Sequence, residues 1–395
     1  MRAIAILQSE LRDGAEIIHA KQWAALWRGV AGLLDGGQLW LTALGRCLPG
    51  RTSDKHRIKA ADRLLGNVAL QLALPSLYAV LARFLLRGIR RPVIVVDWTG
   101  GGSSAFYILT AALCFHGRAL ALYSRTFPVK RKCSPQAEHE FLRELAKIIP
   151  RHCSPIVVTD AGFLAKWFDA VGAIGWDFVG RLRGKRQVLL GDDWFQMEDL
   201  HALAGKKPKD LGICGVYRHE TRPLRVVLSA RPKLKGRHRL STLGTRRQRT
   251  ADRQRSEAAR EPLVLVTSLD DRAVDVLGTY GMRMQIEETF RDLKSHRYGW
   301  SLEDVRCRST SRVDVLLLVA ALAAVVLHMV GLAGRRRKLD HGLQANTLRT
   351  RPVLSTFFLG KLIIRRGLHK LVPSSVLREA LVTLLHQLYA QQALP

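Results

Sequence analysis

Apolar residues recur at helical spacing through the first ninety residues of the chain. Trp23 and Leu26 lie three positions apart, and further apolar residues continue the same stripe. Pro49-Gly50 and Pro75 are expected to break the pattern, because proline and glycine terminate helices. Residues 1–91 are therefore predicted to form a helical region.

The pattern changes after Arg91. Val93–Val96 is a β-branched run that ends at Asp97-Trp98-Thr99 and three glycines, which is typical of a strand that enters a turn. Two more apolar runs, Phe106–Leu113 and Arg118–Ser124, follow at short intervals. The three strands are predicted to form an antiparallel meander.

Helix and strand alternate over the next stretch. A polar helix is predicted for residues 135–149, followed by a short apolar strand at 155–159 that ends in Asp160-Ala161-Gly162. Residues 163–171 predict a second helix, and residues 176–182 a further strand. The expected order is β-β-β-α-β-α, so Asp97 and Asp160 each follow a buried strand, where open α/β sheets place their reacting groups.

Short strand patterns and strong positive charge are combined in residues 184–261. Residues 181–260 hold 21 Lys and Arg against 8 Asp and Glu. We predict an inserted β-rich module that ends in a basic stretch, 231–260, which becomes ordered on a polyanion. The strand pattern resumes at 262–268, and the sequence from Arg272 onward is helical.

Polar residues on this last helix share one face. At 100° per residue, Tyr280, Arg283, Glu287 and Lys294 fall within an arc of about 60°, beside an apolar stripe. Glu288 points elsewhere, so Glu287 is the better catalytic candidate of the two. An ordinary charged helix surface would show the same spacing, and this alternative stays open.

One apolar run resembles a membrane span. Residues 315–327 are all apolar, but the run is shorter than the roughly 20 residues that cross a bilayer. We predict a buried core helix and no membrane partner. The alternative is a span that reaches Ala333.

Charge points to a polyanionic partner. The 395 residues carry 63 Lys and Arg against 33 Asp and Glu, a formal net charge of +30, and 47% of the residues are hydrophobic. Such a chain can bury a large core while it attracts nucleic acid. The segment 51–63 is basic and suited to phosphates or a groove, although a solvated helix face is an equal alternative for any one of its charges. Trp194, Tyr217, Tyr298 and Trp300 lie near basic clusters and could stack on bases or pack in the core.

The six cysteines are scattered and form no C-x-x-C pair, which favours a reducing cytoplasm and speaks against a zinc ribbon or a disulfide framework. The N-terminus has no apolar segment of the kind found in secretory signals.

Three carboxylates are the candidate catalytic groups. Asp97, Asp160 and Glu287 could together hold two Mg²⁺ or Mn²⁺ ions, because hard cations prefer oxygen ligands and a pair of such ions promotes phosphodiester cleavage. Each residue also has a structural alternative, since Asp97 could cap a turn and Asp160 could be the N-cap of the next helix.

The spacing Y-x2-R-x3-E-x6-K in YGMRMQIEETFRDLK, residues 280–294, resembles the Tyr-Arg-Glu-Lys signature of the insertion-sequence-four family of bacterial DDE transposases. The strands VIVVDWT and PIVVTDAGF are similar to the other two acidic motifs of that family, and DKHRIKAADRLLGN resembles its N-terminal part.

The resemblance implies an α/β fold with a ribonuclease H-like mixed-sheet core and a metal-dependent catalytic triad of Asp97, Asp160 and Glu287. It also implies that Tyr280, Arg283 and Lys294 grip DNA phosphates near the cleaved end. The expected organisation is a helical DNA-binding domain (1–91), a catalytic core (92–305) with an insertion at about 184–261, and a helical C-terminal region (306–395) suited to dimerisation. In the basic segment, Lys55, Arg57, Lys59 and Arg63 are the expected DNA ligands.

The implied activity is cut-and-paste transposition in the cytoplasm, at the nucleoid. Its partners would be double-stranded DNA with terminal inverted repeats, target DNA and a second copy of the chain in the synaptic complex. Two alternatives stay open: a catalytically inactive DNA-binding relative or transposition inhibitor, and a metal-dependent nuclease without strand transfer.

Overall fold

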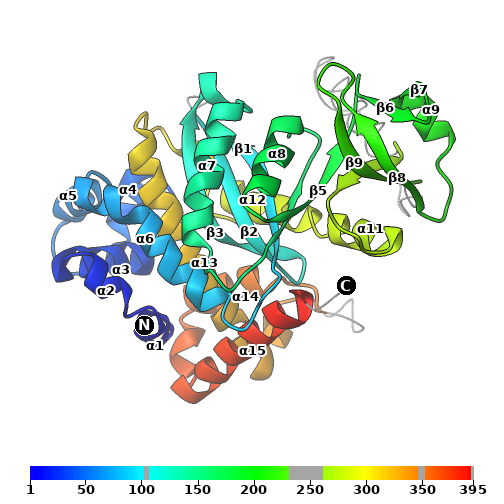
Figure 1. Ribbon diagram of the computed structural model, residues 1–395. Helices are drawn as coiled ribbons and strands as arrows, with labels where there is room; N and C mark the ends of the chain where they lie inside the picture. The colour runs from blue at the N-terminus through cyan, green and yellow to red at the C-terminus, as the bar shows by residue number, and fades with distance from the viewer. Residues whose placement is uncertain (102–105, 231–260, 346–351, 393–395) are drawn as a thin grey trace, which may run out of the picture. The chain divides into compact units, whose positions relative to one another are not determined.

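The three strands predicted after Arg91 form an antiparallel sheet in the computed structural model, in the order β3-β2-β1. The structure describes residues 1–101, 106–230, 261–345 and 352–392. These residues belong to two compact units, of which the first contains Met1–Pro155 with Met284–Leu394 and the second contains Ile156–Arg283. Figure 1 shows the elements with their labels.

The first unit surrounds this small sheet with helices. Its strands are β1 (Val93–Gly100), β2 (Phe106–Phe115) and β3 (Arg118–Pro128). Its longer helices are α1 (Arg2–Glu10), α3 (Ala20–Leu34), α5 (Asp54–Leu65), α6 (Val68–Leu85), α7 (Pro135–Ile148), α12 (Met284–Lys294), α13 (Thr310–Arg336), α14 (Thr356–Arg365) and α15 (Ser374–Gln392). Shorter helical segments are α2 (Gly14–Ile17), α4 (Leu41–Arg46), η1 (Val129–Arg131), η2 (Leu302–Asp304), η3 (Leu339–Gly342) and η4 (Leu368–Leu371).

Helix α13 is the centre of the first unit. It packs against β3 and against helices from both ends of the chain, including α3, α6, α14 and α15. In its most apolar 18-residue window, 94% of the residues are buried inside the protein. The core helix predicted for residues 315–327 is confirmed. By length and composition alone, both α13 and α6 would be able to cross a membrane, but a buried core helix passes the same test.

Helix α6 corrects one predicted break. Pro75 lies inside this helix, which continues for ten residues beyond it to Leu85. Asn67 caps the helix by accepting a hydrogen bond from the backbone N–H of Leu70 at 2.8 Å. Buried Leu74 and Leu77 lie on either side of the proline. Their burial offsets the lost backbone hydrogen bond, a tertiary contribution that local pattern does not reveal.

The second unit is built on a mixed sheet with the strand order β4-β5-β10-β9-β8-β6-β7. Strands β4 and β5 are parallel, and the other described pairs are antiparallel. The strands are β4 (Ile156–Thr159), β5 (Asp177–Leu182), β6 (Gln187–Leu190), β7 (Asp193–Gln196), β8 (Lys209–Val216), β9 (Arg222–Ser229) and β10 (Leu263–Thr267), and the helices are α8 (Ala165–Ala173), α9 (Met197–Ala202) and α11 (Ala273–Gly281).

The predicted order β-β-β-α-β-α is confirmed along the chain, and the fold is a mixed α/β fold as expected. The described strands of the segment 184–261 continue the sheet, because β9 pairs directly with β10. The basic stretch 231–260 lies outside the described residues.

Candidate active site

Asp97 lies within a strand rather than after one. The sequence pattern predicted that the strand ends at Val96, but β1 continues to Gly100, and Asp97 pairs with Thr110 of β2 in its register. The strand extends because β2 supplies backbone partners for every residue up to Gly100. Asp97 is only 9% exposed, and its Oδ1 accepts a hydrogen bond from the backbone N–H of Trp98 at 2.7 Å. It does not cap a turn.

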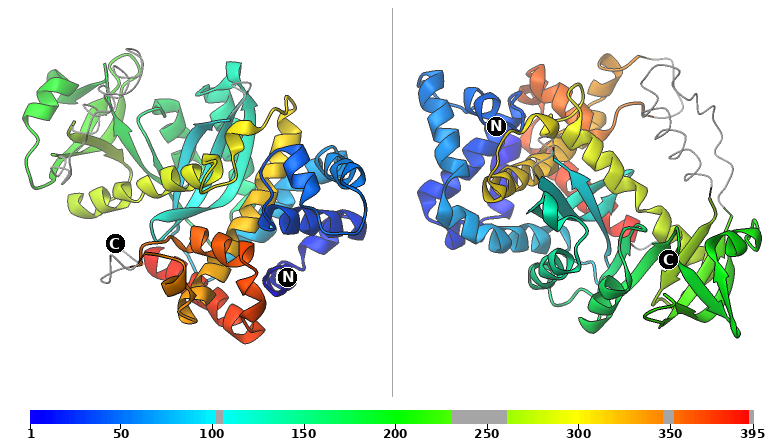
Figure 2. Two further views of the ribbon diagram at one scale, coloured as in Figure 1. Left: turned by 180° about the vertical axis from the view of Figure 1, so that it is seen from behind. Right: turned by 90° about the horizontal axis from the view of Figure 1, so that it is seen from above.

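Trp98, the residue after Asp97, shows which face of the sheet the side chain of Asp97 points to. Alternate residues of a strand point to opposite faces, so Asp97 and Trp98 lie on opposite sides of the sheet. The indole N–H of Trp98 donates to Oε1 of Glu138 on α7 at 3.2 Å, and Glu138 is buried. Asp97 therefore faces away from α7. The views in Figures 1 and 2 place α7 and α12 on opposite faces of this three-stranded sheet.

Helix α12 carries Glu287 and Lys294, and it packs against β1, β2 and β3. The two residues are seven positions apart, which brings them to the same face of the helix. Both are partly buried. Burial lowers the pKa of Lys294, while the negative charges of Glu303 and Asp97 act in the opposite direction. Lys294 thus lies within electrostatic reach of Asp97.

Two polar contacts fasten α12 to the start of β3. Nε of Arg118 donates to Oδ2 of Asp292 at 2.6 Å, and the two side chains are only 20% and 11% exposed. The backbone N–H of Ala119 donates to the hydroxyl of Thr289 at 2.7 Å, and that hydroxyl donates to the carbonyl of Ala119 at 3.0 Å. The helix is therefore held by two side chains that lie between Glu287 and Lys294 in the sequence.

The loop that follows α12 is also held in place. Nζ of Lys361 on α14 donates to the backbone carbonyl of Gly299, and burial lowers the pKa of Lys361 to about 8. Trp300 is buried and packs edge-on against Phe357 at 4.9 Å between ring centroids. Of the two alternatives open for Trp300, the structure supports core packing.

The continuous helix expected from Arg272 is wrong. It is interrupted at Met282 and Arg283, which separate α11 from α12. The backbone N–H groups of Met282 and Arg283 bond to Thr279 and Tyr280, three residues back, so the last turn tightens. Gly278 and Gly281 weaken the helix here. The arc of about 60° therefore does not join all four signature residues, and only Glu287 and Lys294 share a helix.

Asp160, Tyr280 and Arg283 belong to the second unit. Asp160 directly follows β4, and its Oδ1 accepts a hydrogen bond from the backbone N–H of Gly162 at 2.8 Å. It is not the N-cap of α8, because that position is Leu164. Tyr280 is only 5% exposed, whereas Arg283 is partly exposed.

Neither unit gathers, within its described residues, three or more His, Cys, Asp or Glu side chains that could hold a metal ion. The predicted triad draws on both units, with Asp97 and Glu287 in the first and Asp160 in the second. By chemistry the three side chains suit a hard divalent cation, since all of them offer carboxylate oxygens.

A sequence model of the family described as "Transposase DDE domain" matches residues 91–326, more than half of the chain. The chain belongs to this family. The DDE domain contains all three predicted carboxylates and most of α13, and it begins where the helical N-terminal region ends. A search of curated proteins finds no match.

Outside the matched DDE domain, α5 presents a line of cations. Lys55, Lys59 and Arg63 follow one another at intervals of four residues, and all three are exposed. Within the part of the chain that the structure describes, none of the three has an ion-pair or hydrogen-bond partner. Arg57 differs, because it is partly buried, pairs with Asp54 and donates to the carbonyl of Leu48.

Sequence patterns missed the residues that hold β1 and α12, the two elements that carry the predicted carboxylates Asp97 and Glu287. Arg118 and Asp292 are 174 positions apart, and Glu138 is 40 positions from Trp98. Arg118, Asp292 and Glu138 are ordinary charged residues in their local sequence. Only the burial of these charges identifies them, because a charged side chain is rarely buried without a partner.

Proposed function

We propose that this chain is a transposase that cuts DNA at terminal inverted repeats and joins the released end to target DNA. Asp97, Asp160 and Glu287 form its catalytic triad. The observation that carries the proposal is the family match over residues 91–326, which contains these three acidic residues on β1, just after β4 and on α12. The same family supports an enzyme over a protein that only binds DNA.

The donor set fits two Mg²⁺ or Mn²⁺ ions, which Asp97, Asp160 and Glu287 would hold through carboxylate oxygens. When bound, such ions stabilise the charge on the scissile phosphate and on the leaving oxygen. The burial of Asp97 and the docking of α12 limit the movement of two of the three ligands. A preorganised site of this kind needs little rearrangement during the reaction.

Lys294 holds a DNA phosphate beside Asp97. A cation near a carboxylate site reduces the repulsion between the acidic side chains and the phosphodiester backbone. Arg283, which lies in the break between α11 and α12, takes a second phosphate. Tyr280 is buried, so it reaches a DNA phosphate only through its hydroxyl. On α5, Lys55, Lys59 and Arg63 bind the double-stranded DNA of the element end, and Arg57 fixes the start of the helix.

The wider assignments belong to the same proposal. The chain has a ribonuclease H-like core with residues 184–261 as an insertion, it assembles as a homodimer on paired element ends, and it works in the cytoplasm on the nucleoid. Residues 1–91, 92–305 and 306–395 remain the proposed domains.

Cleavage of a plasmid that carries the DNA flanking this gene tests the proposal. Wild-type protein should nick the plasmid in Mg²⁺ and lose the activity in EDTA. Asp97→Asn, Asp160→Asn and Glu287→Gln should each reduce the nicking rate by at least a hundredfold while DNA binding survives. Glu288→Gln is the matched control, because Glu288 is the next residue on the same helix and should not be required for cleavage.

Three results would contradict the proposal. Full nicking by any of the three variants would remove that residue from the triad. DNA binding by wild-type protein without nicking under any divalent metal would favour the inactive DNA-binding relative. Appearance of nicked but never rejoined products would favour a nuclease without strand transfer.

A further inference from the structure

The turn that follows α12 folds back onto the end of that helix. It consists of residues 295–300 and leads into η2. The backbone N–H of Trp300 donates to the carbonyl of Asp292 at 3.1 Å, and that of Gly299 donates to the carbonyl of Ser295 at 3.0 Å. A Cβ atom on Gly299 would lie only 1.8 Å from the carbonyl oxygen of Asp292. The turn 295–300 therefore caps α12, because it satisfies a carbonyl that the helix leaves without an internal partner.

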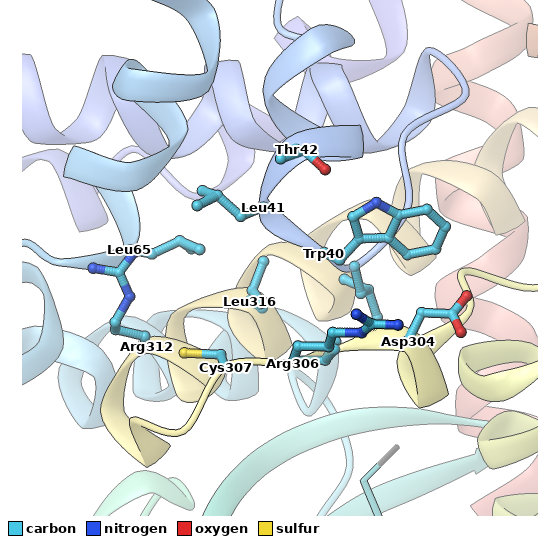
Figure 3. Close-up of a pocket in the computed structure, with 11 residues that line it drawn as sticks. Trp40, Leu41, Thr42, Leu65, Asp304, Arg306, Cys307, Arg312 and Leu316 are labelled. Carbon is cyan, nitrogen blue, oxygen red and sulfur yellow. The ribbon is translucent and has the colours of Figure 1, made fainter. Parts of the chain in front are cut away.

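Two contacts hold this turn from the side of α4 and η2. The backbone N–H of Leu39 donates to the carbonyl of Trp300 at 3.0 Å, and Nδ1 of His296 lies 3.1 Å from Oδ2 of Asp304. Asp304 and Trp40, the residue after Leu39, line the same pocket, which Figure 3 shows. The side chains of His296 and Asp304 are 62% and 41% exposed, so this pair holds the turn only weakly.

A third contact comes from α14, which lies outside the matched DDE domain. Nζ of Lys361 donates to the carbonyl of Gly299 and lies 3.5 Å from the carbonyl oxygen of Tyr298. Burial lowers the pKa of Lys361 only to about 8, so the ammonium keeps its charge at neutral pH. Because the turn packs on the last carbonyls of α12, this charge lies at the negative end of the helix dipole. The contact is a charge-assisted hydrogen bond, which is stronger than one between neutral groups.

Helix α14 gives Lys361 a fixed starting point. Gly360, the residue before it, packs directly on α13, because a Cβ atom there would lie 2.1 Å from the carbonyl oxygen of Leu327. One turn earlier, the hydroxyl of Thr356 is hydrogen-bonded to Nδ1 of buried His328 at 2.7 Å. The backbone that carries Lys361 therefore has little room to move relative to α13.

We propose that Lys361 is a positioning residue for DNA cleavage, which holds the turn 295–300 on α12 and thereby keeps Glu287 and Lys294 in place. The inference rests on the proposed transposase function and adds to it a residue from beyond the matched residues 91–326. A reacting group that moves by about 1 Å can lose roughly a hundredfold in rate. DNA affinity is less sensitive, because it depends on many phosphate contacts. Loss of the Lys361 contact should therefore slow cleavage more than it weakens binding.

Hydrogen exchange tests the contact without DNA or metal. Lys361→Met keeps most of the length of the side chain and removes the ammonium. In the full chain, the peptide that covers residues 288–300 should then exchange roughly fivefold faster than in the wild-type protein. Thr356→Val is the matched control, because it removes the hydrogen bond to His328 and leaves the turn untouched. This variant should exchange at the wild-type rate over the same peptide.

Two exchange results would overturn the proposal. The first is unchanged exchange of residues 288–300 in Lys361→Met. The second is equal acceleration in Lys361→Met and Thr356→Val, because a general loosening of α14 would then explain the effect.

Plasmid nicking in Mg²⁺ connects the contact to cleavage. Lys361→Met should nick about tenfold more slowly than wild-type protein. Its affinity for the DNA of the element end should stay within about twofold, since the phosphate contacts remain. Lys361→Arg should keep at least about half of the wild-type rate, because the guanidinium retains the charge and the donors. Thr356→Val should nick at the wild-type rate.

The nicking assay also separates two failures. If wild-type protein nicks and Lys361→Met nicks equally fast, or if Lys361→Arg is as slow as Lys361→Met, only the role of Lys361 is overturned. Absence of nicking by wild-type protein would instead overturn the proposed function, and the positioning role with it. If Lys361→Met does not fold, Lys361→Gln replaces it in both assays. Its side chain is shorter and uncharged, so it should also give faster exchange and slower nicking.

Discussion

Helices α12 and α5 of the first unit are both short and highly charged. They differ in whether their charged side chains are bonded to the rest of the protein or exposed to solvent. On α12, Asp292 is 11% exposed and bonded to Arg118 of β3, and Thr289 bonds to the backbone of the same strand. On α5, Lys59 and Arg63 are exposed and have no partner among the described residues. The first helix is joined to a sheet through its polar groups, and the second exposes these two cations to solvent.

The difference matches what each helix is proposed to do. A carboxylate that takes part in catalysis must keep its position, so its helix is fixed by contacts that are costly to break. A cation that binds DNA phosphates must remain available, because an internal ion pair would compete with the DNA. Substitutions of Thr289 and Asp292 on α12 should therefore change stability, and substitutions of the unpaired cations on α5 should mainly change DNA affinity.

Removal of Arg118 is expected to have the largest effect. Arg118→Met leaves the carboxylate of Asp292 largely buried without its cation, which should lower the free energy of unfolding by about 2 kcal/mol, less than for a fully buried pair. The rate of plasmid cleavage should fall as well, because α12 loses the ion pair that joins it to β3. Urea unfolding and the plasmid assay measure the two effects. An unchanged free energy of unfolding would show that the ion pair does not hold the helix.

Thr289→Val tests the second contact of α12. Valine has nearly the same shape but cannot accept the hydrogen bond from the backbone N–H of Ala119, so we expect a loss of about 1 kcal/mol in unfolding free energy. Thr289→Ser keeps the hydroxyl and is the control. The comparison of the helices would be weakened if valine and serine behaved alike in the same urea titration.

Asp292→Asn should have a smaller effect at neutral pH and a clear signature in its pH dependence. Burial raises the pKa of Asp292, and Arg118 offsets this only in part. The folded protein therefore binds that proton more tightly than the unfolded chain, so the wild-type free energy of unfolding declines as the pH rises above about 4. Asparagine does not titrate and should make the decline shallower. Urea titrations at several pH values from 4 to 7 check this, and identical slopes for the two proteins would contradict it.

Lys59→Ala should change stability least, by no more than about 0.5 kcal/mol, because the side chain is exposed. The main effect of the substitution should be on DNA binding. The slope of log affinity against log salt concentration should decrease in magnitude by about one. Arg57→Ala is the matched comparison on the same helix. Since Arg57 bonds inside the protein, it should lower the melting temperature and leave the salt slope unchanged. If Arg57→Ala reduced the salt slope and Lys59→Ala lowered the melting temperature, the roles of the two residues would be exchanged.

Much of the fold could be predicted because its signals are local. The β-branched run before Asp97, the two strands after it and the apolar run of α13 follow from spacing between near neighbours, and the structure confirms them. Where the prediction was wrong, a tertiary contribution changed the local outcome. Pairing with β2 extends β1 through Asp97, and burial on either side of Pro75 keeps α6 intact.

For the candidate site, too, some features follow from local sequence and others from tertiary contacts. The sequence by itself determined that Asp160 follows a strand, that Glu287 and Lys294 share a helix, and that the charge suits a polyanionic partner, because residue type and spacing are enough for these. Only the tertiary structure decided that Tyr280 and Lys294 lie on different helices and that Arg118 anchors Asp292. It also decided that Lys59 and Arg63 of α5 have no partner among the described residues. Those outcomes depend on burial and on contacts between residues far apart in the chain, which a local pattern does not contain.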